Sequence, residues 1–169
     1  TGGNVGNVTV HIEGSQFTPG TTIRLVDING GLIAEATPTV TSSSEMDVTF
    51  DLTGVTPDTY NVVIEKPNNA PISLANAFTV IPGTGAGLEA RLLVPQQVRP
   101  GLAYTLWVEY ANTGDTDMLA PLFIVSTEQS VQKKLMQADN YGIDPVQLVG
   151  IGFEGPAGVL RPGARYRIP

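Results

Sequence analysis

Residues 13–25 read EGSQFTPGTTIRL, and the turn inside this stretch decides the fold class. Proline sets φ to about −65° at the second position of a β-turn, and glycine accepts the positive φ that a type II turn needs next. The turn therefore reverses the chain and leads it into an alternating apolar run. The same device returns before similar runs at residues 99–106 (RPGLAYTL) and 161–168 (RPGARYRI). A repeated strand-opening turn predicts a protein built from β-modules.

The composition agrees with many short strands. The chain has 169 residues, of which 19 are Gly and 13 are Pro, and 41% are hydrophobic. This combination is typical of strands joined by tight turns rather than of disorder. The net charge of −7 disfavours binding to nucleic acid or anionic lipid. No apolar run reaches the 18 residues of a membrane span, so we expect neither nucleic acid nor a membrane as a partner.

The charges divide the chain into two parts. Residues 1–82 carry eight acids against Arg24 and Lys66, a net charge of −6, whereas residues 83–169 carry eight acids against seven bases, a net charge of −1. Residues 83–87 (GTGAG) have the composition of a flexible linker. We therefore expect one module at 1–82, a linker at 83–87 and a second module at 88–169. The chain contains no cysteine, which excludes disulfides and thiolate chemistry.

The first module shows the period-two alternation of half-buried strands. A weaker run at 32–41 contains Pro38, which favours an edge position. The apolar residues on one side of the strands are Val8, Val10, Ile12, Ile23, Leu25, Val48, Phe50, Leu52, Tyr60, Val62, Ile64, Phe78 and Val80.

Four segments of the first module carry a family resemblance. They are residues 8–12 (VTVHI), 14–21 (GSQFTPGT), 57–62 (PDTYNV) and 77–80 (AFTV). Their order and spacing resemble an IPT/TIG domain, an immunoglobulin-like β-sandwich, over residues 5–81. Asp58 stands where that family usually has Gly, which leaves the fold expectation unchanged. The resemblance implies that 14–21 joins the first two strands and that Phe17 closes one end of the core.

Apolar and polar residues also alternate in the second module. The clearest run is 104–110, where Tyr104, Leu106, Val108 and Tyr110 share one face. Further strands are expected at 88–94, 119–125, 146–153 and 165–168. Between them, Val131, Leu135 and Ala138 fall at helical spacing among good helix formers, which predicts one short helix at 128–139.

A second resemblance rests on residues 99–104 (RPGLAY), 109–114 (EYANTG) and 160–163 (LRPG). They resemble the immunoglobulin-like, cell-adhesion-type modules that occur in tandem in large bacterial surface proteins. About five strands are expected here, where a complete sandwich has about seven. Three explanations stay open: a truncated or processed module, a strand supplied by a neighbouring chain, or a strand missed in the count.

The residues suited to catalysis are few and scattered. His11, the one histidine, lies on the polar face of the first strand, which predicts a surface residue. Asp47 and Asp51 share a strand face about 13 Å apart, farther than the carboxyl pairs of glycosidases. We therefore expect a solvated face here, no catalytic residue and no enzyme.

Asn112, Asp115 and Asp117 place three oxygen-bearing side chains in one loop. Calcium takes such ligands, which makes these residues a candidate calcium site, and calcium is the one cofactor that the sequence suggests. Turn chemistry also explains Asn and Asp in this position.

Trp107 is expected outside the core, because its apolar neighbours on the strand point to the opposite face. Three interpretations compete: packing against the helix at 128–139, a contact between the modules, and a platform that stacks on carbohydrate.

The sequence as a whole predicts an all-β protein of two immunoglobulin-like sandwiches in tandem, with a structural, adhesion or spacer role in a secreted or cell-surface protein. Two alternatives are an accessory module of an extracellular polysaccharide-active enzyme, which would bind carbohydrate, and a subunit of a filament or layer that exchanges strands. The expected partners are neighbouring modules, other surface proteins or further copies of the chain.

Overall fold

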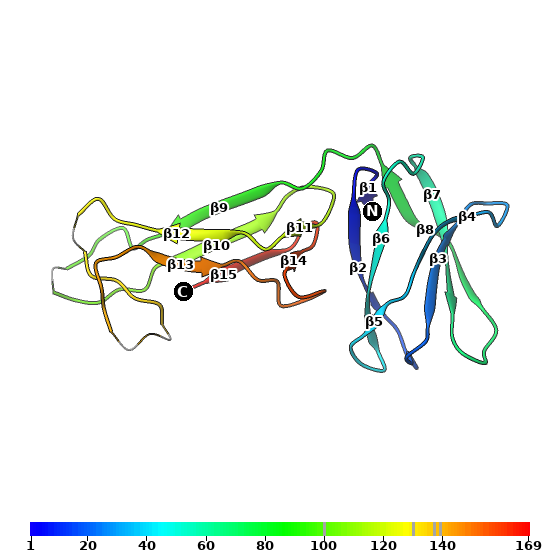
Figure 1. Ribbon diagram of the computed structural model, residues 1–169, viewed down its shortest axis with the longest axis horizontal. Coiled ribbons are helices and arrows are strands. Elements are labelled where there is room, and N and C mark those ends of the chain that lie inside the picture. Colours follow the sequence, from blue (N-terminus) through cyan, green and yellow to red (C-terminus); the bar gives the residue numbers. More distant parts are fainter. Residues whose placement is uncertain (100, 130, 137, 139) are drawn as a thin grey trace.

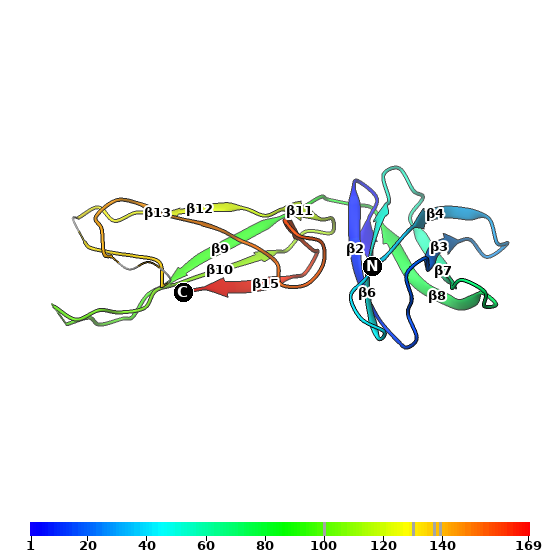
Figure 2. The same cartoon turned by 60° about the horizontal axis from the view of Figure 1, so that its bottom comes forward.

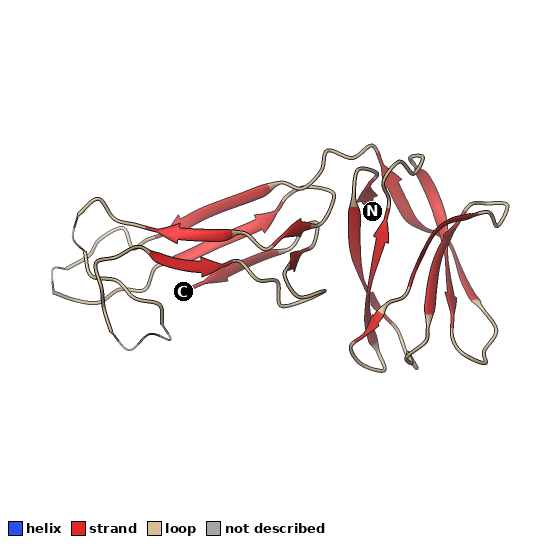
Figure 3. Ribbon diagram, viewed as in Figure 1, coloured by secondary structure: helices blue, strands red, loops and turns tan. Residues whose placement is uncertain are grey.

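The computed structural model describes residues 1–99, 101–129, 131–136, 138 and 140–169, and every regular element in these residues is a β-strand (Figures 1 and 3). The predicted all-β fold is confirmed. Within the described ranges, no helix has the length and apolar character needed to cross a membrane.

The first half of the chain forms two sheets around one core. One sheet has the strand order β1-β8-β7-β3-β4, and the other has the order β2-β6-β5. The strands are β1 (Gly2–Gly3), β2 (Asn7–Glu13), β3 (Thr22–Val26), β4 (Leu32–Ala36), β5 (Thr39–Val40), β6 (Glu45–Asp51), β7 (Asp58–Glu65) and β8 (Ile72–Ile81). The weak run at 32–41 is two edge strands in different sheets, with Pro38 at the crossing between them.

The alternating residues of these strands meet between the sheets. Thirteen buried apolar side chains form a single cluster, and they include every residue predicted for the core except Val10 and Ile12, which pack against it half-buried. Phe17 belongs to the cluster although it lies in a loop, and only 7% of its surface is exposed. The expectation that Phe17 lies in the core is confirmed.

All three predicted turns form. In each turn the glycine has a φ between +75° and +87°, the left-handed region that the third position of a type II turn requires. The closing hydrogen bonds run at 3.1–3.3 Å from the N–H of Thr21 to the carbonyl of Thr18, from Leu102 to Arg99 and from Ala164 to Arg161. Pro100 of the second turn lies outside the described residues.

The second half forms one three-stranded sheet, β15-β10-β9, and two two-stranded ladders, β11-β14 and β12-β13. The strands are β9 (Leu88–Leu93), β10 (Trp107–Asn112), β11 (Met118–Leu119), β12 (Leu122–Val125), β13 (Val146–Val149), β14 (Val159–Leu160) and β15 (Arg165–Ile168). Figure 2 shows β12 and β13 in one layer and β9, β10 and β15 in the other. Side chains from both layers surround the buried Val108, Tyr110 and Leu160.

The expected count of about five strands in the second half is wrong, because the described residues hold seven. The predicted strand at 119–125 is two strands with Pro121 in the gap, and β14 was missed. Two boundaries also move. The predicted strand at 104–110 begins only at Trp107, and the one at 146–153 ends at Val149, after which the Gly150 N–H donates to the carbonyl of Pro121 at 2.8 Å.

The helix predicted at 128–139 is wrong for the described part of that range. Residues 130, 137 and 139 lie outside the described residues, and the others form no helix. Lys133 and Gly142 instead form an antiparallel bridge, with N–H to carbonyl distances of 2.7 and 2.9 Å. Of the three residues predicted for the apolar face of the helix, Val131 is exposed and Leu135 and Ala138 are half-buried, and none of the three belongs to either core cluster. A helix of this length needs such packing, because its own propensity leaves it marginal.

Candidate functional site

The residues that sequence analysis singled out as calcium ligands lie where the two halves of the molecule meet. The segment 112–117 begins with the last residue of β10 and continues as a loop, and it contacts both the linker 83–87 and the segment 2–9, which holds β1 and the start of β2. In Figure 1 this region connects the two ends of the elongated molecule. We call residues 2–9, 83–87 and 112–117 the joint.

Asn112 is fully buried, and all of its side-chain hydrogen-bonding groups are used. Its Oδ1 accepts the N–H groups of Gly87 at 3.1 Å and Gly114 at 3.0 Å. Its Nδ2 donates to the carbonyls of Thr116 at 2.8 Å and Leu160 at 2.9 Å. One amide therefore ties the linker, the loop and β14 together, and it leaves no free oxygen for a metal ion.

Asp115 holds the linker through its carboxylate. Oδ2 accepts the N–H and the hydroxyl of Thr84 at 2.7 and 2.9 Å, and Oδ1 accepts the N–H of Gly85 at 2.9 Å. The Asp115 main chain also accepts the Gly3 N–H at 2.8 Å and donates to the carbonyl of Gly85 at 3.0 Å. Burial raises the pKa of Asp115, but the hydrogen bonds from Thr84 and Gly85 outweigh it and hold the pKa below its ordinary value.

Asp117 holds the first strand of the neighbouring sheet. Its two carboxylate oxygens accept the N–H of Thr9 at 2.9 Å and the hydroxyl of Thr9 at 2.7 Å. Its own N–H donates to the carbonyl of Asn7 at 2.8 Å. Burial raises the pKa of Asp117, and the Thr9 hydrogen bonds and the charge of Arg161 offset that effect only in part. Because β2 lies at a sheet edge, these contacts also cover backbone groups that would otherwise be open.

The linker is bonded along most of its length. The N–H groups of Gly83, Thr84, Gly85 and Gly87 all donate to side chains, which belong to Asn4, Asp115 and Asn112. Composition alone predicted a flexible linker. The side chains that hold it come from loops distant in the sequence, so no local pattern could show them.

Two glycines allow this close approach. A Cβ on Gly114 would overlap the Gly85 carbonyl oxygen, and a Cβ on Gly3 would overlap the Asp115 carboxylate. The contact at Gly114 cannot relax by a side-chain movement, because the opposing atoms are backbone, whereas a Cβ at Gly3 would displace the carboxylate that holds the linker. The sequence signal for these positions is the glycine itself, although turn chemistry explains glycine equally well.

The structure thus places the three predicted calcium ligands at the end of β10 and in the loop after it, but gives each a different partner. The oxygens of Asn112, Asp115 and Asp117 accept N–H and O–H donors from the linker, the loop and β2. In the described part of the chain, no group of three or more His, Asp or Glu side chains is arranged to hold a metal ion. Calcium binding at these residues stays a prediction.

Trp107 lies on the outer face of the three-stranded sheet, as expected. The guanidinium carbon of Arg167 stands 5.1 Å from its ring centroid, which is a cation–π contact. Packing against a helix at 128–139 is wrong, since the described residues there form none. Trp107 is not part of the joint, because it begins β10 and the joint begins at the last residue of that strand, about 16 Å farther along; a contact with another module stays a prediction. Carbohydrate stacking stays a prediction.

His11 and Asp47 depart from the solvated face that the sequence suggested. His11 Nδ1 lies 2.9 Å from Asp47 Oδ1, and Asp47 is buried, with 6% of its side chain exposed. Asp51 is exposed, as expected. The two residues of the pair are cross-strand neighbours on β2 and β6. That pairing was not visible in the sequence, because it depends on the register between strands 36 residues apart.

A comparison of the chain with known family models, curated proteins and solved structures finds no match. The resemblances to IPT/TIG domains and to bacterial adhesion modules therefore stay predictions, as does the division into domains at 83–87.

Proposed function

We propose that the chain is a non-catalytic structural element of a secreted or cell-surface protein, in which two β-modules serve as spacer or adhesion units. In this proposal residues 1–82 and 88–169 are the modules, and the joint sets the angle between them. A spacer holds its ends at a defined distance only if the connection between its units resists bending. The joint is therefore the part of the molecule on which this function depends.

The observation that carries the proposal is the bonding of the linker. Its N–H groups are taken up by Asn4, Asp115 and Asn112, and Asp117 binds the edge of β2 from the other side. The acceptors at Asn4 and Asn112 are neutral amides and those at Asp115 and Asp117 are carboxylates, and an intramolecular hydrogen bond to a neutral group contributes about 0.5–1.5 kcal/mol. Several of them acting together favour one relative orientation of the halves over the many that a free five-residue linker would allow.

A distance measurement between the halves tests the proposal. The chain has no cysteine, so cysteines introduced at the exposed positions Asn29 and Ser126 can be labelled alone with nitroxides. Pulsed electron resonance should give one narrow distance distribution. The double variant Asp115→Ala, Asp117→Ala should broaden it, whereas Asp144→Ala, which removes an exposed acid outside the joint, should leave it unchanged. A broad distribution in the unmutated joint would contradict the spacer function.

A further inference from the structure

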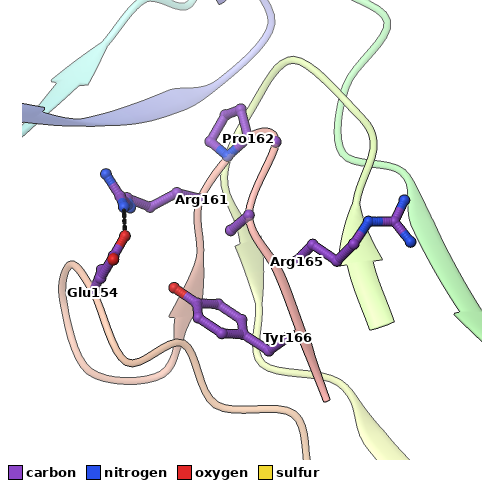
Figure 4. A pocket seen from close by; sticks show the side chains of 7 residues that line it. Glu154, Arg161, Pro162, Arg165 and Tyr166 are labelled. Atoms are coloured by element: carbon purple, nitrogen blue, oxygen red, sulfur yellow. Dashed lines mark hydrogen bonds and ion pairs between the residues drawn. The ribbon is translucent and has the colours of Figure 1, made fainter. Parts of the chain in front are cut away.

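The pocket beside β15, of about 450 Å³, is lined by charged side chains that already have partners (Figure 4). Arg161 is paired with Glu154, and Arg165 is paired with Glu89 and Glu109. A charged ligand would have to displace these partners, which belong to the same chain. The surface chemistry that stands out lies instead in the loop between β3 and β4.

This loop, residues 27–31 (DINGG), lies at the end of the molecule away from the second half (Figures 1 and 2). Residues 28–31 are all exposed, and 91% of Ile28 is exposed. The side chain of Asn29 makes no hydrogen bond in the described residues. Gly30 has a φ of +84°, and a Cβ at this position would meet open space. The loop therefore exposes an unbonded amide directly before a glycine.

Asn29 is the only one of the nine asparagines that precedes a glycine. The other eight precede Val, Asn, Ala, Thr or Tyr. A side chain on the following residue hinders the approach of its backbone nitrogen to the asparagine amide, and glycine has no such side chain. Loss of the amide by this route is one reason why asparagine is a thermolabile residue.

We propose that Asn29 is a site of spontaneous deamidation in the folded protein. The backbone nitrogen of Gly30 loses its proton to solvent and attacks the Cγ carbon of Asn29. The new C–N bond closes a succinimide ring, the bond from Cγ to the amide nitrogen breaks, and that nitrogen leaves as ammonia. Water then cleaves the ring at Cγ, which gives aspartate, or at the main-chain carbonyl, which gives isoaspartate. In sum, one water is taken up and one ammonia is released, with no oxidation or reduction.

The turn controls the rate of this reaction, because Asp27 holds the attacking nitrogen in place. The N–H of Gly30 donates to the Asp27 carbonyl at 3.1 Å, and Asp27 Oδ1 accepts the N–H groups of Asn29 and Gly31 at 2.8 and 2.7 Å. The turn must open before the Gly30 nitrogen can reach Cγ. Such an opening is local, since none of residues 28–31 is buried and two of them are glycines.

The product changes the chemistry of this end of the molecule. Either product adds a carboxylate beside that of Asp27, in a half of the chain that already carries a net charge of −6. In isoaspartate the main chain is also longer by one methylene, which moves the N–H of Gly31 relative to Asp27 Oδ1. Deamidation therefore alters the turn that presents the exposed Ile28. This inference does not depend on the spacer function.

Peptide mass spectrometry tests the proposal on the whole protein, kept at mildly alkaline pH and shown to be folded by circular dichroism. Deamidation at Asn29 should raise the mass of its peptide by about 1 Da, the difference between water and ammonia. Isoaspartate should give a second chromatographic peak of the same mass. Asn29 should convert faster than each of the other eight asparagines. In the matched control Asn29→Gln the amide must close a larger ring, so this position should show no gain over the same period.

The variant Asp27→Ala distinguishes a reaction in the opened turn from a reaction in unfolded molecules. It removes the acceptor of two N–H groups, and the loss of one hydrogen bond of about 1 kcal/mol raises the open fraction about fivefold. The rate at Asn29 should therefore rise about fivefold or more. The control Asp144→Ala, which removes an exposed acid of the second half, should leave the rate unchanged.

Three results would overturn the proposal. The first is no conversion at Asn29 in the time in which a synthetic peptide of residues 25–35 converts fully. The second is faster conversion at another asparagine. The third is an equal rate in Asp27→Ala and the unmodified protein, which would mean that only unfolded molecules react. If Asp27→Ala does not fold, the comparison of the nine asparagines in the unmodified protein still decides.

Discussion

The two halves of the molecule use the same turns and the same alternation, but they bury their apolar side chains to different extents. Thirteen buried residues form the first core, whereas three of the described residues form the second. In the first half, a five-stranded sheet faces a three-stranded one. In the second half, a three-stranded sheet faces two short ladders, and Leu119, Leu122, Ile124 and Val149 remain exposed. Alternation therefore predicts strands, while burial depends on how much of a second layer covers them.

This difference predicts that a large-to-small substitution lowers the free energy of unfolding most when it is made in the first core. Phe50 is buried and packs against Phe78 with ring centroids 6.0 Å apart. Phe50→Ala should lower the free energy of unfolding by about 3–5 kcal/mol, because it removes apolar contacts and leaves a cavity. The matched variant Phe153→Ala, at an exposed aromatic of the second half, should cost about 1 kcal/mol or less. Urea denaturation followed by circular dichroism measures both, and equal losses would show that the two halves do not differ as described.

An intermediate effect is expected at the joint, where the two halves share hydrogen bonds. Asn112→Ala should lower the free energy of unfolding by about 1–3 kcal/mol, since buried carbonyls of Thr116 and Leu160 lose their donor. The control is Asn29→Ala, because Asn29 is exposed and its side chain makes no hydrogen bond in the described residues. Thermal melting of both variants checks this. An unchanged melting temperature in Asn112→Ala would contradict this prediction and would mean that water replaces the hydrogen bonds of the amide without a loss of stability.

The smallest effect is a pH dependence in which the two joint acids act in opposite directions. Asp115 has a lowered pKa, so the stability it adds is present above its ordinary value of 3.8 and is lost as pH falls through the lowered one. Asp117 has a raised pKa, so the folded state favours its protonated form, and that advantage is lost as pH rises through the raised value.

Melting temperatures measured between pH 2.5 and 7 distinguish the contribution of Asp115 from that of Asp117. Asp115→Asn should melt lower than the unmodified protein at pH 7, with the difference closing toward pH 2.5. The melting temperature of Asp117→Asn should rise relative to that of the unmodified protein as pH rises above about 4. Each of these differences in melting temperature should be about 4 °C or less. If the curves of melting temperature against pH run parallel for all three proteins, neither carboxylate is the source of the pH dependence.

Sequence patterns found the strands where a local rule decides the structure. The three proline–glycine turns and the alternating face of Val48, Phe50 and Leu52 follow from such rules, whereas the burial of Phe17 was expected only from the family resemblance. The helix at 128–139 failed because helical spacing says nothing about whether a surface exists to receive the apolar face. The burial of Asp47 was missed for a related reason, since its partner His11 lies on another strand.

The candidate site was half predicted. Asn112, Asp115 and Asp117 stand out in the sequence as a cluster of polar side chains, and the structure does place them together. Their partners, the linker and the edge of β2, are 25 to 108 residues away in the sequence, so the role of the cluster as a joint could not be read from its own residues.

The sequence by itself determined that this protein is all-β, because backbone sterics at glycine and proline and the period-two alternation act over a few neighbouring residues. Only the tertiary structure decided what connects the strands: a hydrogen-bonded joint in place of a free linker, and the buried pair of His11 and Asp47 across β2 and β6. These features arise from contacts between segments far apart in the chain, and local propensity does not encode such contacts.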